Sequence, residues 1–104
     1  MSTDRYGGGI SLYEGLPPTT LADPAALSGA VVGAAAAIGL SAYGPPVVRS
    51  DPSGIAVCLL CREGHIVLHA HPEQGRCAVD VFAAPHLMAA KGIAVIERRL
   101  GVRR

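Results

Sequence analysis

Two strand-like runs separated by only two residues constrain the fold of this chain more than any other feature. Residues 55–62 are almost continuously apolar, and residues 65–71 alternate between polar and apolar side chains. Glu63-Gly64 joins the two runs, which predicts a pair of strands with a tight connection. Since successive strand residues point to opposite faces, the histidines of the second run are expected on one face and its aliphatic residues on the other.

A long uncharged segment from Pro24 to Val48 predicts a buried helix rather than a membrane span. Asp23 is a good N-cap with proline at the first helical position, and Gly39 is well placed to end the helix after about Ile38. The segment is as long as a bilayer requires, but it consists mostly of Ala and Gly and is interrupted by Pro45-Pro46. One face of the helix carries Leu27, Val31, Ala34 or Ala35, and Ile38.

The remaining segments predict short strands and a second helix. Strands are expected over residues 10–14, 47–49, 77–83 and 93–96, with a loop over residues 15–23. A helix of about two turns is expected from Pro85 to Lys91, stopped by Gly92. Residues 1–8 are expected to be a flexible arm of a single domain, residues 1–104. The predicted class is α+β, a βαβββ(α)β protomer with helices on one face of a mostly antiparallel sheet.

Length and charge indicate which partners to expect. A chain of 104 residues builds only a modest core, so we expect pairing with a second chain as a homodimer or heterodimer. The formal net charge is +1, and the basic residues cluster only in the C-terminal arginines. We interpret that cluster as a solvated end, and we predict no nucleic-acid partner and no membrane partner.

Three cysteines indicate the redox compartment. Cys58, Cys61 and Cys77 are an odd number and follow no secretory signal, so reduced thiols and a cytoplasmic protein are expected. Cys58 and Cys61 form a C-x-x-C pair inside a predicted strand. Redox motifs of this kind open a helix, whose dipole lowers the thiol pKa, so redox chemistry is not the favoured interpretation.

Histidines form the densest polar feature of the sequence. His65, His69 and His71 share one strand face, with Glu63 before them and Glu73 after them. If these side chains converge, the chain is a small histidine-rich metal-binding domain, which we keep as an alternative. The favoured interpretation has no metal site.

Residues 63–82, with the sequence EGHIVLHAHPEQGRCAVDVF, resemble the signature of bacterial-type S-adenosylmethionine decarboxylases. The match extends back through Pro52-Ser53-Gly54-Ile55, and Tyr13-Glu14-Gly15 resembles the first strand of that family. The resemblance implies an S-adenosylmethionine decarboxylase-like α+β layer that is dimeric.

The departures from the family pattern concern chemically active positions. Gly64 occupies the position of the serine that cleaves its own chain to form the pyruvoyl cofactor, and glycine has no nucleophile. Ala56 stands where the family has a serine that assists processing, and Ala84 where it has a proton-donating cysteine. We therefore expect no pyruvoyl group, no self-processing and no ordinary decarboxylase activity. Whether the chain is an enzyme is left open.

The retained positions suggest an adenosyl ligand. By resemblance, Tyr13, Glu14, Glu73 and His65 are candidates for substrate binding, with Tyr13 stacking on adenine and Glu73 holding the ribose hydroxyls. His69, Glu63 and His71 are candidates for proton transfer or charge placement.

Three hypotheses about function follow. The first is a protein that binds S-adenosylmethionine, or a related adenosyl thioether, and acts on it by non-pyruvoyl chemistry of a lyase or transferase type. Intramolecular displacement at the sulfonium is an example of such chemistry. The second is a catalytically dead, polyamine-related pseudoenzyme that regulates a decarboxylase paralogue by heterodimerisation. The third is the histidine metal site.

Overall fold

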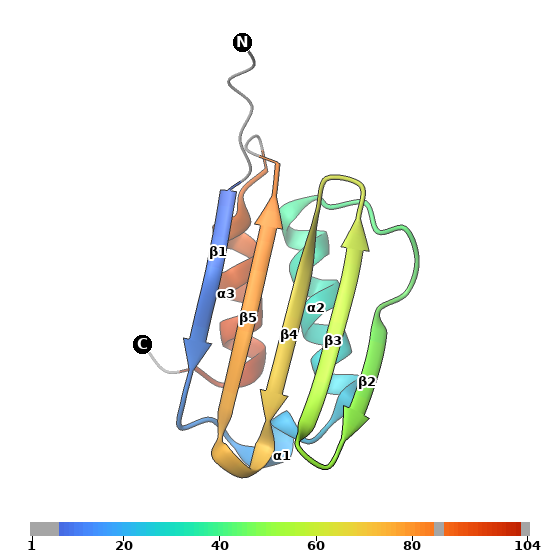
Figure 1. Cartoon of the computed structure of the whole chain (residues 1–104). Helices are drawn as coiled ribbons and strands as arrows, with labels where there is room; N and C mark the ends of the chain where they lie inside the picture. The colour runs from blue at the N-terminus through green and yellow to red at the C-terminus, as the bar shows by residue number, and fades with distance from the viewer. Residues whose placement is uncertain (1–6, 85–86, 103–104) are drawn as a thin grey trace.

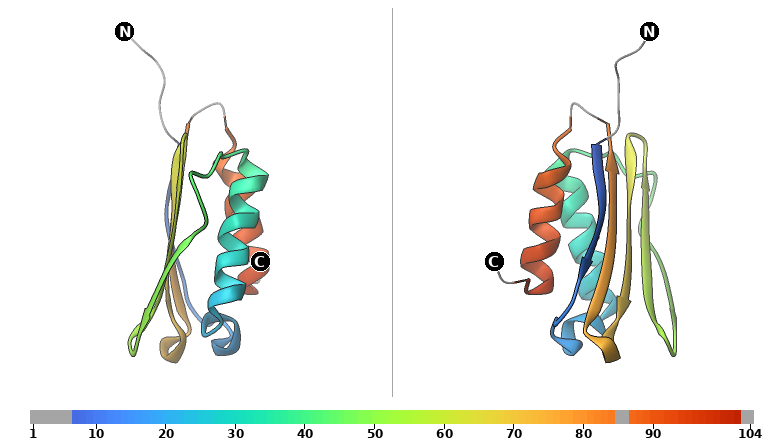
Figure 2. Two further views of the ribbon diagram at one scale, coloured as in Figure 1. Left: turned by 90° about the vertical axis from the view of Figure 1, so that its right-hand side faces the viewer. Right: turned by 60° about the vertical axis from the view of Figure 1, so that its left-hand side comes forward.

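The computed structural model describes residues 7–84 and 87–102 of the 104-residue chain. They form two layers, a five-stranded antiparallel sheet and a layer of helices on one of its faces (Figure 1, Figure 2). The elements are β1 (Gly7–Tyr13), α1 (Pro18–Leu21), α2 (Pro24–Ile38), β2 (Val47–Asp51), β3 (Gly54–Cys61), β4 (Gly64–His71), the 3-10 turn η1 (Pro72–Gln74), β5 (Arg76–Ala83) and α3 (Ala89–Leu100). The expected α+β class and antiparallel sheet are therefore confirmed.

The strand β4 lies at the centre of the sheet, whose order is β1-β5-β4-β3-β2. It pairs with β3 on one side and with β5 on the other, both antiparallel. The aliphatic residues Ile66, Leu68 and Ala70 are completely buried, whereas His69 is exposed. The predicted two-residue period of this strand is confirmed, and it divides the histidines from the core.

The helix α2 begins and ends where the sequence predicts. The Asp23 side chain accepts hydrogen bonds from the backbone N–H groups of Ala25 and Ala26, at 3.0 and 3.3 Å. Gly39 ends the helix with a φ of 95°, a left-handed conformation that favours glycine. The predicted apolar face, including Leu27 and Val31, is buried against the sheet.

The C-terminal prediction is wrong over residues 87–88, which are not helical, and over residues 92–96. Helix α3 runs from Ala89 through Gly92 to Leu100, where a helix end and a closing strand were expected. The buried residues Gly92, Ile96 and Leu100 recur every four residues, which is a helical spacing. Gly92 is a packing residue rather than a helix stop, because a Cβ there would lie 2.2 Å from Cδ1 of Ile38 on α2. The start of the predicted helix, Pro85 and His86, lies outside the described residues.

Two smaller differences concern the N-terminal half. The predicted loop over residues 15–23 contains the short helix α1, whose Leu21 is completely buried. The strand β1 begins at Gly7, so Gly7 and Gly8 of the expected arm belong to the sheet, and residues 1–6 lie outside the described part. Within that part, no helix has the length and apolar character needed to cross a membrane.

Candidate functional site

The face of the sheet that points away from the helices is uncovered, and we call it the open face (Figure 2). Large apolar side chains of four strands are exposed there: Ile10, Leu12, Val47, Leu60 and Phe82. Cross-strand pairing aligns His65 with Leu60 and Phe82, and His69 with Ala56 and Ala78. The predicted histidine face is therefore part of a broad, mostly apolar surface.

His65 forms a compact cluster near the start of β4. Its Nε2 lies 3.2 Å from Oδ2 of Asp80, and its ring stacks on Phe82 with centroids 5.2 Å apart and an interplanar angle of 17°. A carboxylate oxygen only accepts, so Nε2 donates and Nδ1 is the free acceptor of the neutral ring. Asp80 was not identified from the sequence, although it belongs to the matched signature and alternates with Phe82 on β5.

His69 and His71 lie farther along β4 and line one small cavity of about 140 Å³. Nδ1 of His71 is 3.1 Å from the backbone carbonyl oxygen of Ser53. That oxygen cannot donate, so Nδ1 is the donor of this contact and Nε2 is the ring nitrogen that the contact leaves open. Because Ala56 is small and lies opposite His69, it leaves space above this part of β3.

Glu63 holds a loop in place. Its two carboxylate oxygens accept hydrogen bonds from the backbone N–H of Ser41 at 2.7 Å and from the Ser41 hydroxyl at 2.8 Å. These two bonds lower the pKa of the Glu63 carboxyl below its usual value. A carboxylate with a lowered pKa and both oxygens occupied is a poor proton carrier, so the geometry favours a structural role for Glu63.

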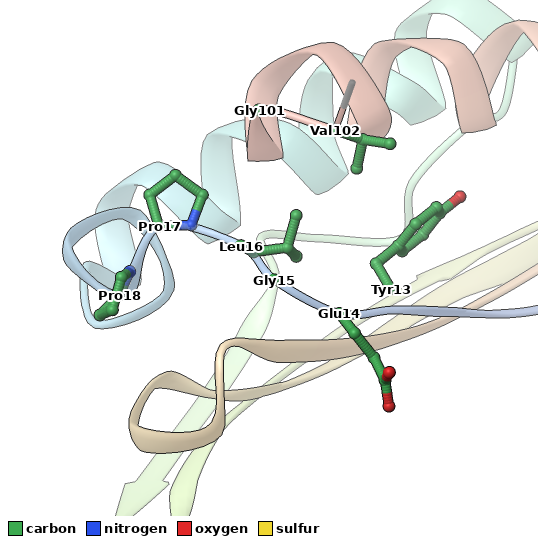
Figure 3. A pocket seen from close by; sticks show the side chains of 8 residues that line it. All are labelled: Tyr13, Glu14, Gly15, Leu16, Pro17, Pro18, Gly101 and Val102. Atoms are coloured by element: carbon green, nitrogen blue, oxygen red, sulfur yellow. The ribbon is translucent and has the colours of Figure 1, made fainter. Parts of the chain in front are cut away.

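Tyr13 and Glu14 lie at the end of β1 and point to opposite sides of it (Figure 3). The Tyr13 ring is buried on the helix side, and its hydroxyl donates a 2.8 Å hydrogen bond to the Glu97 carboxylate of α3. Glu14 forms an exposed ion pair with Arg76, with 3.2 Å between Oε1 and Nε. Both residues line a cavity of about 530 Å³ that also reaches Val102.

Glu73 lies on η1 and lines a different cavity, of about 340 Å³, beside Pro24 and Asp51. The two members of the predicted adenosyl-binding pair, Tyr13 and Glu73, therefore do not share a cavity within one chain. His69 and His71 share a third cavity, and His65 lies apart from all three.

Gly64 has no room for a side chain in this conformation. A Cβ at this position would lie 1.8 Å from the carbonyl oxygen of Phe82 and 2.9 Å from Cα of Ala83 on the paired strand. The carbonyl oxygen of the preceding residue, Glu63, accepts a 3.0 Å hydrogen bond from the N–H of Ala84. Glycine at position 64 thus permits a close approach between β4 and β5.

The cysteines are free thiols held apart by the sheet. Cys58 is partly exposed and Cys61 is buried, because residues three apart on a strand point to opposite faces. Burial raises the pKa of Cys61, with a smaller contribution from Glu63, and raises the pKa of Cys77 to about 12. The C-x-x-C sequence therefore does not form a dithiol pair.

The metal-binding alternative depended on convergence of the three strand histidines with a carboxylate. Over residues 7–84 and 87–102, no group of three His, Cys, Asp or Glu side chains is arranged to hold a metal ion. His65 contacts Asp80 and His71 contacts the backbone carbonyl of Ser53, so the two rings have separate partners.

Comparison with known proteins gives consistent results. The family model described as S-adenosylmethionine decarboxylase matches residues 10–104. An S-adenosylmethionine decarboxylase proenzyme of Parasynechococcus marenigrum is 32% identical over 96 residues, which cover 91% of this chain and 74% of that protein. A proenzyme of the same name from Pseudomonas aeruginosa is 39% identical over 57 residues, 54% of this chain, so the match spans only 36% of that relative's length.

The fold has a counterpart of known structure. A crystal structure of the adenosylmethionine decarboxylase from Aquifex aeolicus superimposes with a TM-score of 0.81 at 19% sequence identity, covering 93% of this chain and 81% of that one. At this identity the likeness establishes the shared fold.

Proposed function

Because this chain belongs to the S-adenosylmethionine decarboxylase family, we propose that it binds an adenosyl thioether such as S-adenosylmethionine without forming a pyruvoyl group. The ligand is inferred from the names of the relatives. The absence of self-processing is inferred from this chain's own residues, above all Gly64.

Gly64 is the observation that carries the proposal. A serine here would supply the hydroxyl that self-cleavage needs, and glycine supplies none. The close approach of Phe82 supports the same conclusion, since it leaves no space in which such a side chain could work. Ala56 and Ala84 at the two other active positions of the family pattern are equally inert.

The chemistry left to such a protein is chemistry that the ligand already carries. In S-adenosylmethionine the sulfonium is a good leaving group, and the carboxylate of the methionyl tail is a nucleophile in the same molecule. Attack by a carboxylate oxygen on the carbon two bonds from the α-carbon breaks the carbon–sulfur bond and closes a lactone. The electron pair of the broken bond stays on sulfur, so methylthioadenosine leaves as a neutral thioether. A pocket that holds the methionyl tail in the folded conformation would accelerate this displacement, because orientation alone lowers the barrier by about 7–11 kcal/mol in favourable cases.

Among the predicted proton-transfer residues, His69 and His71 fit this role better than Glu63. Both histidines line a cavity on or beside the open face, whereas the oxygens of Glu63 are bound to Ser41. A protonated imidazole next to the folded tail would place positive charge near the reacting carboxylate, and a neutral one would offer it a hydrogen-bond donor.

Two measurements test the proposal. Intact mass spectrometry is expected to give one uncleaved chain, and two fragments that divide between Glu63 and Gly64 would refute it. Titration calorimetry is expected to detect binding of S-adenosylmethionine and of methylthioadenosine. No heat from either at about millimolar ligand, the weak limit for a specific site, would end the adenosyl hypothesis. Chromatography of a long incubation then identifies methylthioadenosine as product.

The open face supports the proposal of a dimer. Ile10 is 79% exposed, Leu12 63% and Leu60 60%. Large apolar side chains gathered on one exposed face are typical of an interaction surface. A second copy of this chain is the simplest partner, and a catalytic paralogue is the partner that the pseudoenzyme hypothesis requires.

Sedimentation equilibrium distinguishes these partners. Leu60→Glu places a charge on the open face and is expected to give monomers. Val32→Glu is the matched control, because Val32 is also exposed, at 46%, but lies on α2 in the helix layer. A wild-type monomer at high concentration would exclude the homodimer, and co-purification with an active decarboxylase would then support the pseudoenzyme.

A further inference from the structure

The cavity that His69 and His71 share also contains fixed charges of both signs, and we call it the His71 cavity. Arg49 and Asp51 of β2 line it together with Ala56 of β3. The two charged residues are two apart on one strand, so their side chains emerge on the same face. They pair with Ala56 and Gly54 respectively. Small residues therefore form the floor, and charged or titratable residues form the walls.

The absence of a side chain at Gly54 leaves the space that the His71 ring occupies at the edge of this cavity. A Cβ there would lie 2.2 Å from the carbonyl oxygen of Ala70 and 3.1 Å from Nδ1 of His71. The missing side chain lets the His71 ring lie over the end of β3, where Nδ1 contacts the carbonyl of Ser53. Nε2 is thereby the nitrogen of His71 left for a ligand.

Arg49 supplies the positive charge. A guanidinium has five N–H donors and carries its charge at every working pH. The structure uses Nη1 for a 2.8 Å bond to the backbone carbonyl of Val48, and the remaining donors have the fork geometry that suits a carboxylate.

Asp51 supplies the negative charge. Its Oδ1 accepts hydrogen bonds from the hydroxyl and backbone N–H of Ser53 and from the N–H of Gly54. The bonds from Ser53 are the main reason that the pKa of Asp51 lies below its usual value, so the group is a carboxylate at neutral pH. All three bonds end on Oδ1, and Oδ2 takes part in none of them.

The volume of the His71 cavity limits the ligand to a small group. The cavity of about 140 Å³ is smaller than the roughly 300–1,000 Å³ of most ligand pockets. A space of this size suits the nitrogen, α-carbon and carboxylate of an amino acid head better than it suits a whole adenosine.

We propose that the His71 cavity binds the zwitterionic head of an α-amino acid, with its carboxylate on Arg49 and its ammonium on Asp51. This inference rests on the proposed function where the amino acid is the methionyl part of S-adenosylmethionine. Free L-methionine carries the same head and is the other source of this chemistry. His69 and His71 then flank the carboxylate that would act as the nucleophile.

Calorimetry with two ligands tests the assignment, because S-adenosylmethionine has the amino acid head and methylthioadenosine lacks it. Arg49→Ala is expected to weaken binding of S-adenosylmethionine by about tenfold or more, the usual effect of losing a charge-assisted hydrogen bond. Binding of methylthioadenosine is expected to stay unchanged. Arg62→Ala, at the exposed turn beyond the far end of β3, is the charge-matched control and should alter neither ligand. An equal loss for both ligands, or no loss for either, overturns the proposal.

Asp51→Asn is the second variant, because asparagine keeps Oδ1 as an acceptor for Ser53 and Gly54 while removing the charge. This variant is expected to weaken the binding of S-adenosylmethionine and to leave the binding of methylthioadenosine and the melting temperature unchanged. If the wild-type protein binds neither adenosyl compound, the proposed function fails on its own, and L-methionine becomes the probe. Addition of L-methionine is then expected to shift the ring-proton NMR signals of His69 and His71 in the wild-type protein but not in Arg49→Ala. No shifts in the wild-type protein would overturn the cavity assignment.

Discussion

Gly64→Ser restores the family's serine at the start of β4, and we expect it to destabilise the sheet without restoring self-cleavage. The new Cβ would lie 1.8 Å from the carbonyl oxygen of Phe82 and 2.8 Å from its carbonyl carbon, both backbone atoms that no rotamer change can move. The strands must separate by roughly 1.5 Å before ordinary contact distances return. Overpacking of this kind costs about 1–3 kcal/mol. Weakening of the Ala84 N–H bond to the Glu63 carbonyl adds about 1 kcal/mol.

The expected loss is therefore about 2–4 kcal/mol in the free energy of unfolding. For a domain of this size it lowers the melting temperature by at least about 8 °C. Urea unfolding and thermal melts at one fixed protein concentration measure it, since a dimer's stability depends on concentration. Gly9→Ser is the matched control, because Gly9 also lies in a strand and a Cβ there meets nothing within 4 Å. A Gly64→Ser protein as stable as Gly9→Ser, or one that cleaves itself, would refute the reasoning.

Three further results are expected from single residues. Hydrogen bonds from Ser41 lower the pKa of Glu63 from its usual 4.5, so the stability that Glu63 contributes is complete above that value and is lost as the pH falls through the lowered pKa. Between about pH 5 and 3, the melting temperature of Glu63→Gln should therefore change less with pH than that of the wild type. Parallel curves for the two proteins would contradict this. Tyr13→Phe should lower the free energy of unfolding by about 1 kcal/mol, because it removes the bond to Glu97, and an unchanged urea midpoint would contradict it. In alkylation at pH 8 the partly exposed Cys58 should react first, while buried Cys77, with a pKa of about 12, stays unmodified until the protein unfolds; early mass labelling of Cys77 would show otherwise.

The parts of the fold that the sequence predicts well depend on residues close together in the chain. The alternation along β4 and the cap of α2 by Asp23 are local patterns, and both are confirmed. The error at Gly92 has a different origin. A glycine after a short apolar run is typical of a helix end, but here its missing side chain is required by Ile38, a residue more than fifty positions earlier on another helix.

The candidate site was less predictable because its contacts join distant parts of the chain. The sequence makes Glu63 a candidate for proton transfer or charge placement, but it does not indicate the hydrogen bonds to Ser41, a residue 22 positions away that no motif connects with it. By resemblance Tyr13 is expected to stack on adenine, but the sequence does not indicate the hydrogen bond of its hydroxyl to Glu97, 84 positions away. A resemblance to a family identifies which residues persist. It does not identify their partners, which depend on how the layers pack.

The geometry of β4 explains how the proposed ligand binding can be independent of self-cleavage. Gly64 and His71 lie at opposite ends of the strand, which is about 23 Å at the usual rise per residue. Losing the side chain at Gly64 affects the pairing of β4 with β5, whereas the His71 cavity is formed by β2, β3 and the far end of β4. The two ends have no side chain in common, so substitutions at one end leave the charges at the other intact. A chain that lost its self-cleaving serine would keep Arg49, Asp51 and His71 in place, and ligand binding is the property that those residues can still support.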